Sequence, residues 1–325
     1  MKKGIVFLIT IILIFSFVII GINKSISVKQ KDDKIKIIAT LFPQYDFAKQ
    51  IGGDKVDVEL LLTPGTETHT YEPTPQDIIN VNKADIYIYT GKYMEPWSDK
   101  IANSITSNTK VLDASKNIDL INEENFEKEH TTIDEKNSED FHNDEYDPHI
   151  WLNPQNAIIM VKNITEELCD IDKKNEKYYK ENSEKYINEL IKLDNEIEDT
   201  VRSSKSKKIA FGGTFAYAYF IQRYNLQYIS AYDSCGENSE PSVAKVKEVI
   251  DYIKQNNINV IFYQELSAGK IADTISKETG AKKLIFHTIH NASKEEINNG
   301  ETYISLMKKN LQNLKQALNW YSIKI

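Results

Sequence analysis

Histidines are the residues of this chain whose side chains could bind a metal ion. Neutral imidazoles suit zinc and other late divalent metals, whereas Mg2+ and Ca2+ prefer oxygen ligands. A single histidine is more often a surface or hydrogen-bonded residue than a ligand, and none of these lies in a short regular motif. Metal chemistry therefore depends on whether the fold brings several of them together. The chain has six: His69, His130, His142, His149, His287 and His290.

The two cysteines, Cys169 and Cys235, exclude a cysteine-rich zinc module and a disulfide-dense scaffold. Cys235 follows a predicted strand, so it is either a thiolate ligand or an inert loop thiol. Cys169 lies on a predicted helix and is expected in the core.

Strands alternating with helices predict an α/β fold of two Rossmann-like lobes with mostly parallel sheets. The first lobe is expected over residues 35–175 and the second over residues 204–325. The predicted strands are 35–41, 56–62, 85–90, 208–211, 227–231, 259–263 and 282–286. The predicted helices are 45–51, 74–83, 156–169, 176–202, 215–224, 243–255, 270–279 and 303–318.

One long connector helix is expected over residues 176–203, between the lobes. Its apolar residues recur at helical spacing, and charged residues surround them. At about 1.5 Å per residue this helix would be roughly 40 Å long, which suits a stiff connector. The expected buried face is Tyr179, Tyr186, Leu190, Leu193 and Ile197.

Three histidines are placed where ligands bind in such folds. His69 follows the second predicted strand, His287 follows the last one, and His149 lies on a loop. Ligands of open α/β sheets bind beyond the carboxyl ends of the strands. These three side chains could therefore converge on a cleft between the lobes.

The charge is concentrated in one segment. The chain has a formal net charge of −8, which argues against a nucleic-acid partner. An acidic insert over residues 122–147 holds eleven acidic residues against two lysines, together with His130 and His142. Such charge runs are typically solvated. We expect this insert to gather cations weakly rather than to form the primary site.

The first residues indicate export. Residues 4–22 carry no charge and follow Lys2 and Lys3. As a helix they would be about 28 Å long, enough to cross a hydrocarbon core. Residues 1–24 are therefore predicted to be a membrane anchor or, as the alternative, a cleaved signal segment, with residues 25–34 as a linker. The rest of the chain is expected outside the cytoplasm, tethered to the membrane or secreted.

Two segments resemble ligand motifs of the zinc/manganese solute-binding proteins of ABC transporters, cluster A-I, of the zinc-uptake type. They are Thr63-Pro64-Gly65-Thr66-Glu67-Thr68-His69-Thr70-Tyr71-Glu72-Pro73-Thr74-Pro75-Gln76-Asp77 and Asp147-Pro148-His149-Ile150-Trp151-Leu152-Asn153-Pro154. Residues 84–91 and Glu95-Pro96-Trp97 also fit. The similarity runs from about residue 35 to about residue 319.

The resemblance implies a metal site made by His69, His149 and His287. The third ligand position of the family falls on Thr214, a poor zinc ligand, and the fourth falls on or near His287. The remaining place stays open to water, a carboxylate, His290 or Cys235. Glu265, which also follows a strand, is expected to be an outer hydrogen-bond acceptor or a capping residue.

The resemblance implies a receptor that captures Zn2+, less favourably Mn2+, and delivers it to an ABC permease as a monomer. The alternative is a zinc hydrolase with three histidines and a bound water. No His-Glu-x-x-His helix and no general base support that alternative. A third reading, a surface adhesin, would not need histidines at strand ends.

Overall fold

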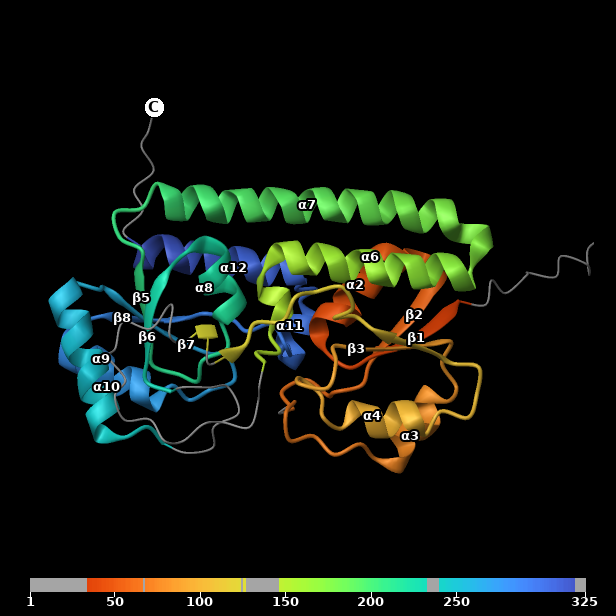
Figure 1. Ribbon diagram of the computed structural model, residues 1–325, viewed down its shortest axis with the longest axis horizontal. Coiled ribbons are helices and arrows are strands. Elements are labelled where there is room, and N and C mark those ends of the chain that lie inside the picture. The colour runs from red at the N-terminus through yellow and green to blue at the C-terminus, as the bar shows by residue number, and fades with distance from the viewer. Residues whose placement is uncertain (1–33, 67, 124, 127–145, 233–239, 319–325) are drawn as a thin grey trace, which may run out of the picture. The chain divides into compact units, whose positions relative to one another are not determined.

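The computed structural model describes residues 34–66, 68–123, 125–126, 146–232 and 240–318 (Figure 1). Two four-stranded parallel sheets organise the chain, in the orders β2-β1-β3-β4 and β6-β5-β7-β8. Both lobes thus have the same strand order, and the predicted fold class is confirmed. The strands are β1 (Ile35–Ala39), β2 (Val56–Leu60), β3 (Ile86–Tyr89), β4 (Lys110–Asp113), β5 (Lys208–Phe211), β6 (Gln227–Ser230), β7 (Val260–Tyr263) and β8 (Lys282–Ile285).

Helices connect the strands within each lobe. The first lobe has α2 (Phe42–Gly52), α3 (Pro75–Val81), α4 (Ser98–Asn103) and α6 (Pro154–Ile171), with 3-10 turns at Gly53–Lys55, Ile150–Leu152 and Lys173–Asn175. The second has α8 (Ala218–Tyr224), α9 (Val243–Asn256), α10 (Lys270–Thr279), α11 (Lys294–Asn298) and α12 (Tyr303–Ala317). The sequence did not predict β4, α4 or α11, because elements this short show little apolar periodicity.

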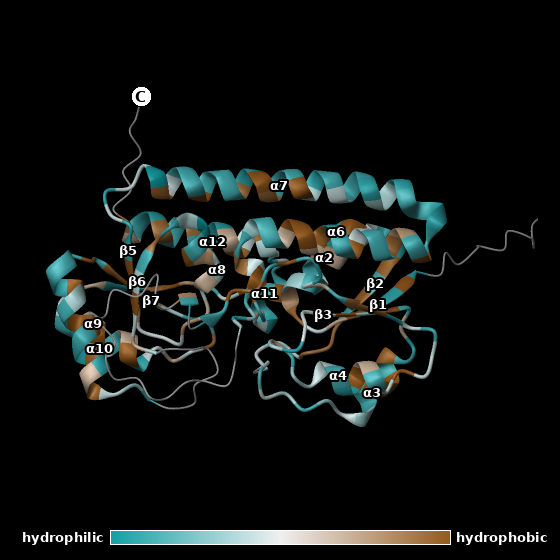
Figure 2. Ribbon diagram, in the orientation of Figure 1, coloured by the Kyte–Doolittle hydropathy of each residue, from teal (hydrophilic) through white to brown (hydrophobic). Residues whose placement is uncertain are grey.

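The long helix α7 (Glu176–Arg202) packs on both lobes. It contacts α2 and α6 of the first lobe and α8 and α12 of the second. In Figure 2 the α7 ribbon is mostly hydrophilic, with apolar residues at intervals along it. All five residues of the predicted apolar face are buried. The predicted connector helix is therefore present.

Asp194 fixes α7 to its neighbours on either side. Its buried carboxylate accepts hydrogen bonds from Arg223 (2.7 Å) and Tyr224 (2.8 Å) of α8. It also accepts one from Gln155 of α6 (2.6 Å). A buried carboxylate is costly unless it is paired, so these three donors make α7 a fixed bridge between α6 and α8.

The start of the acidic insert is packed into the fold. Asn122 forms an antiparallel bridge with Tyr146. Phe126 is buried and stacks on Phe215 and Tyr228 of the second lobe. Most of the insert, including His130 and His142, lies outside the described residues. The described residues at both ends of the insert therefore belong to the fold.

The predicted anchor at residues 1–24 also lies outside the described residues. Among the helices that the structure does describe, none is long and apolar enough to cross a membrane. Residues 35–325 form one compact unit, separate from residues 1–34.

A chain that begins at Ile35 is expected to fold alone and to unfold in one cooperative transition. The reason is that one hydrophobic cluster runs through both lobes, from Ile37 in β1 to Leu318 after α12. Urea unfolding followed by far-ultraviolet circular dichroism and by aromatic fluorescence should give coincident curves. Separate transitions by the two probes, or no cooperative transition, would show that the lobes do not fold as one unit.

Candidate metal centre

Three histidines from separate segments lie next to one another. The ring centroids of His69 and His149 are 5.8 Å apart, and those of His149 and His290 are 6.5 Å apart. His149 is buried, whereas His69 and His290 are partly exposed. In the described part of the chain, no group of three or more His, Cys, Asp or Glu side chains already surrounds one metal position.

Asp147 orients His149. The Asp147 carboxylate accepts the backbone N–H of His149 at 2.7 Å and lies 3.1 Å from His149 Nδ1. An ionised carboxylate can only accept, so Nδ1 carries the proton and Nε2 keeps its lone pair. Most metal-bound histidines likewise donate the N–H of their other ring nitrogen to a carboxylate, a carbonyl or a water. Asp147 opens the motif at residues 147–154, but its spacing alone gave no sign of this role.

The loop that carries His69 is held by residues of both lobes. Trp97 Nε1 donates to the carbonyl of Thr68 at 2.9 Å, and the Trp97 ring packs edge-on against Tyr71 at 5.0 Å. From the second lobe, Asn291 Nδ2 donates to the carbonyl of Thr66 at 2.9 Å. The loop is therefore fixed on both sides of the ligand candidate.

The segment after β8, residues 287–291, crosses to the first lobe. Trp151 Nε1 donates to the carbonyl of Thr288 at 2.8 Å, and the Phe42 N–H donates to the carbonyl of His290 at 3.2 Å. Within the segment, the Thr288 hydroxyl lies 2.6 Å from His290 Nδ1. These contacts place His290 beside the loop of His149.

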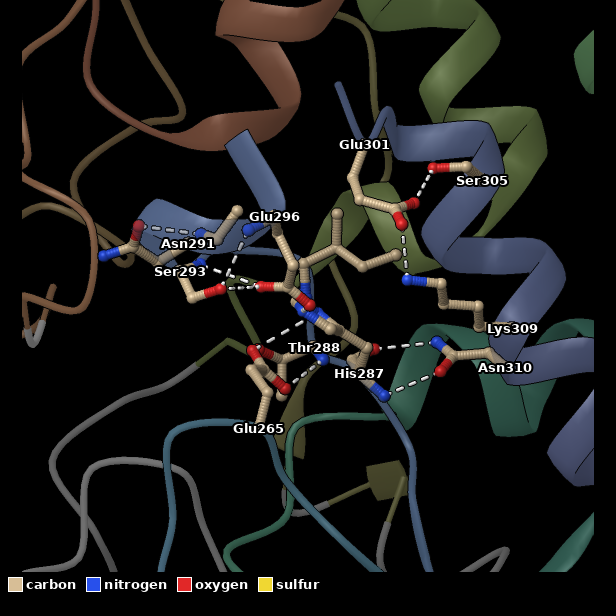
Figure 3. Close-up of polar contacts among 12 residues, drawn as sticks. Glu265, His287, Thr288, Asn291, Ser293, Glu296, Glu301, Ser305, Lys309 and Asn310 are labelled. Atoms are coloured by element: carbon tan, nitrogen blue, oxygen red, sulfur yellow. Dashed lines mark hydrogen bonds and ion pairs between the residues drawn. The ribbon is translucent and has the colours of Figure 1, made fainter. Parts of the chain in front are cut away.

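His287 has a different environment. Its Nδ1 accepts the Ile289 N–H at 2.9 Å, and its Nε2 lies 3.3 Å from Glu296 Oε1 (Figure 3). Burial lowers the pKa of His287, but the carboxylates of Glu265 and Glu296 outweigh it, and the pKa is raised. In the opposite direction, the hydrogen bond from His287 lowers the pKa of Glu296 to about 2. Among the described residues, His287 has no ring contact with the other three histidines.

Both ring nitrogens of His287 thus have close polar neighbours, the Ile289 N–H at Nδ1 and Glu296 Oε1 at Nε2. These contacts favour a structural role for His287 and make His290 the better second-lobe candidate. Asn310 fixes the backbone of His287 on both sides: its Oδ1 accepts the His287 N–H at 2.7 Å, and its Nδ2 donates to the His287 carbonyl at 2.8 Å.

Thr214, at the family's third position, hydrogen-bonds to Gln264. Cys235 lies outside the described residues. Cys169 is buried, as expected, and burial raises the pKa of its thiol. Glu265 accepts hydrogen bonds from Thr288, which fits the outer acceptor expected from the sequence.

Two parallel α/β lobes are bridged by one helix, and histidines of both lobes lie side by side between them. This is the arrangement of a two-lobed solute-binding protein with a candidate metal site. The chain belongs to the family described as zinc-uptake complex component A, periplasmic, whose sequence model matches residues 37–317. The family predicted from the sequence is confirmed.

Known relatives agree with this membership. The high-affinity zinc uptake system protein ZnuA of Bacillus subtilis (strain 168) is 38% identical over 293 residues, covering 90% of each chain. The crystal structure of the metal-dependent lipoprotein YcdH from Bacillus subtilis matches with a TM-score of 0.74 at 35% identity, covering 88% of this chain and 99% of that one. The Zn(II)-bound ZnuA-like domain of Streptococcus pneumoniae AdcA matches with a TM-score of 0.73 at 30% identity, with the same coverage.

Proposed function

We propose that this chain is an extracytoplasmic receptor that captures Zn2+, with Mn2+ less favoured, and delivers it to an ABC permease for uptake. The observation that carries the proposal is the series of ring contacts from His69 through His149 to His290, which joins both lobes. Imidazole nitrogen suits zinc better than manganese, which prefers oxygen. The zinc uptake named for ZnuA and the bound Zn(II) of the AdcA domain support the same cargo.

His69, His149 and His290 are the ligands that we propose. His287, the second-lobe ligand expected from the sequence, is the alternative and would pair with Glu296, whose Oε1 lies 3.3 Å from its Nε2. The fourth position is left to water or to Cys235. Partial exposure of His69 and His290 would give the ion a path from solvent.

Metal analysis of the purified protein tests this function. Elemental analysis of protein prepared without added metal should find zinc, close to one ion per chain. Competitive titration should then give tighter binding of Zn2+ than of Mn2+. Protein that binds neither ion would overturn the proposal. Tighter binding of Mn2+ than of Zn2+ would make Mn2+ the transported ion.

A zinc hydrolase is not favoured. Such an enzyme would need a general base beside a metal-bound water. Asp147, beside His149, and Glu265, beside Thr288, already accept hydrogen bonds from those residues. The family relatives are uptake proteins by name, which supports a receptor that is not an enzyme.

Residues 1–24 complete the proposal as an uncleaved membrane tether, followed by a linker at residues 25–34. The charge-free run over residues 4–22 and the two preceding lysines support an orientation that exports the rest of the chain. We propose that the receptor acts as a monomer.

Replacing residues 127–145 by a short glycine linker is expected to leave the equilibrium affinity for zinc nearly unchanged. The linker can close the gap because Asn122 pairs with Tyr146 at its base, while Phe126 stays in the core. His149 lies outside the deleted residues. Titration of both proteins with zinc tests this, and zinc uptake by cells at scarce metal should slow if the segment gathers ions. A loss of affinity as large as that of His149→Ala would place the segment in the primary site.

A further inference from the structure

Glu265 is joined to His290 through Thr288. Glu265 follows β7, and its carboxylate accepts both the backbone N–H of Thr288 (2.8 Å, to Oε2) and the Thr288 hydroxyl (to Oε1). The Glu265 side chain is only 6% exposed, and Thr288 is fully buried. Figure 3 shows the Glu265 carboxylate beside Thr288 and His287, in the segment that follows β8. The same Thr288 hydroxyl lies 2.6 Å from His290 Nδ1.

The order of donors fixes the tautomer of His290. A threonine hydroxyl has one proton, and an ionised carboxylate can only accept. Because that proton is donated to Glu265, the hydroxyl must accept from His290. His290 therefore carries its proton on Nδ1, and Nε2 keeps the lone pair that a metal needs.

The backbone supports this geometry at both ends. Ile289, between Thr288 and His290, has φ 64°, and Leu266, directly after Glu265, has φ 60°. Positive φ is unusual for residues other than glycine and is a genuine outlier for a β-branched residue. Such strain persists only where the surroundings over-determine it. Here Ile289 is fully buried, and its N–H donates to His287 Nδ1 at 2.9 Å.

We propose that Glu265 and Thr288 are positioning residues for the metal site: through the chain Glu265–Thr288–His290 they hold His290 in the Nδ1–H tautomer and present its Nε2 to zinc. This inference rests on the proposed function for its metal, but the tautomer itself is a property of the metal-free protein. His287 Nδ1 also lies near Glu265, but it accepts the Ile289 N–H. In neutral His287 this nitrogen therefore has no proton to donate to Glu265.

Two substitutions have different expected effects on the tautomer. Thr288→Val keeps the side-chain shape but removes the hydroxyl, so His290 should lose its preference for the Nδ1–H form. Glu265→Gln should reverse the direction of the hydrogen bonds that run from His290 through Thr288 to residue 265. If its amide oxygen stays on the Thr288 N–H, its NH2 group donates to the hydroxyl, which then gives its own proton to His290 Nδ1. His290 should then become the Nε2–H tautomer.

The test is long-range 1H–15N NMR of 15N-histidine-labelled, metal-free protein at pH 8, with the His290 signals identified by their loss in His290→Ala. Wild type and Thr288→Ser should show the Nδ1–H pattern at His290, Thr288→Val a mixture, and Glu265→Gln the Nε2–H pattern. Zinc affinity should fall about tenfold in Thr288→Val and Glu265→Gln, and Thr288→Ser should restore it.

A merely structural role would change the melting temperatures of the variants and leave both the His290 pattern and the affinity at wild-type values, which would overturn the inference. So would the Nε2–H pattern in wild type. If wild type shows the expected tautomer but binds no zinc, the proposed function is wrong, but the hydrogen bonds from Glu265 through Thr288 still set the tautomer of His290.

Discussion

His290→Ala is expected to weaken zinc binding by at least about a hundredfold, roughly 2.8 kcal/mol. His290 is the second-lobe histidine whose ring lies beside His149, at a centroid distance of 6.5 Å. Its removal would leave His69 and His149 as the only histidines of the proposed site and would release the second lobe from the metal. Isothermal titration with zinc at fixed pH, with a competing chelator, measures the change.

His287→Ala is the comparison for that experiment. His287 is buried, with Nδ1 on the Ile289 N–H and Nε2 beside Glu296. Its loss should lower the free energy of unfolding, because the buried Ile289 N–H loses its acceptor and the partly buried Glu296 carboxylate loses one neighbour. Zinc affinity should fall less than in His290→Ala. If the order of the two affinities is reversed, His287 is the ligand that the sequence motif indicated, and the pair His287 and Glu296 holds the metal.

The three-residue step from His287 to His290 shows what the sequence could not predict. The sequence motif places the second-lobe ligand directly after the last strand. Which side chain faces the site, however, depends on how the chain leaves β8. Ile289 adopts a positive φ there, and a β-branched residue gives no sign in the sequence that it will do so. The tight contact between Thr288 and His290 forms in this turn and is visible only in the structure.

The two motifs of the first lobe were more predictable. His69 and His149 each lie in a long segment with turn and helix-start residues at fixed offsets. Thr74, for example, caps α3 by accepting the Asp77 N–H. Their neighbourhood follows from the sheet, because both lie where parallel strands end. The partners that orient them, such as Asp147 and Trp97, depend on packing between loops and could not be assigned from spacing.

Glu95 is a further residue that the sequence left without a role. It is completely buried beyond the ends of β1 and β3, where it accepts hydrogen bonds from the Thr40 hydroxyl and from the Thr90 N–H, the latter at 2.8 Å. Gln44 extends this network, since it donates to the Thr90 hydroxyl and accepts the Leu41 N–H at 2.9 Å. Burial raises the pKa of Glu95 to about 8, although both hydrogen bonds lower it.

Glu95→Gln is expected to make the protein more stable than wild type in alkaline solution. The pKa of Glu95 is about 8 in the folded chain and about 4.5 as an ordinary side chain. Between these values the folded chain binds more protons than the unfolded chain, so the free energy of unfolding must fall as pH rises, by at most about 1.4 kcal/mol per pH unit from this group. Below about pH 4.5 both states are protonated and the group has no effect.

Glutamine removes that dependence but retains the hydrogen bonds. Its oxygen can accept the Thr90 N–H, and its NH2 group can donate to the Thr40 hydroxyl. Urea unfolding of both proteins at intervals from pH 5 to pH 9 should therefore give stabilities that separate steadily up to about pH 8 and stay apart above it. Curves that remain parallel across this range would mean that Glu95 is ionised in the folded protein at neutral pH. In that case the two hydrogen bonds, rather than a proton, stabilise the carboxylate where the strands of the first lobe end.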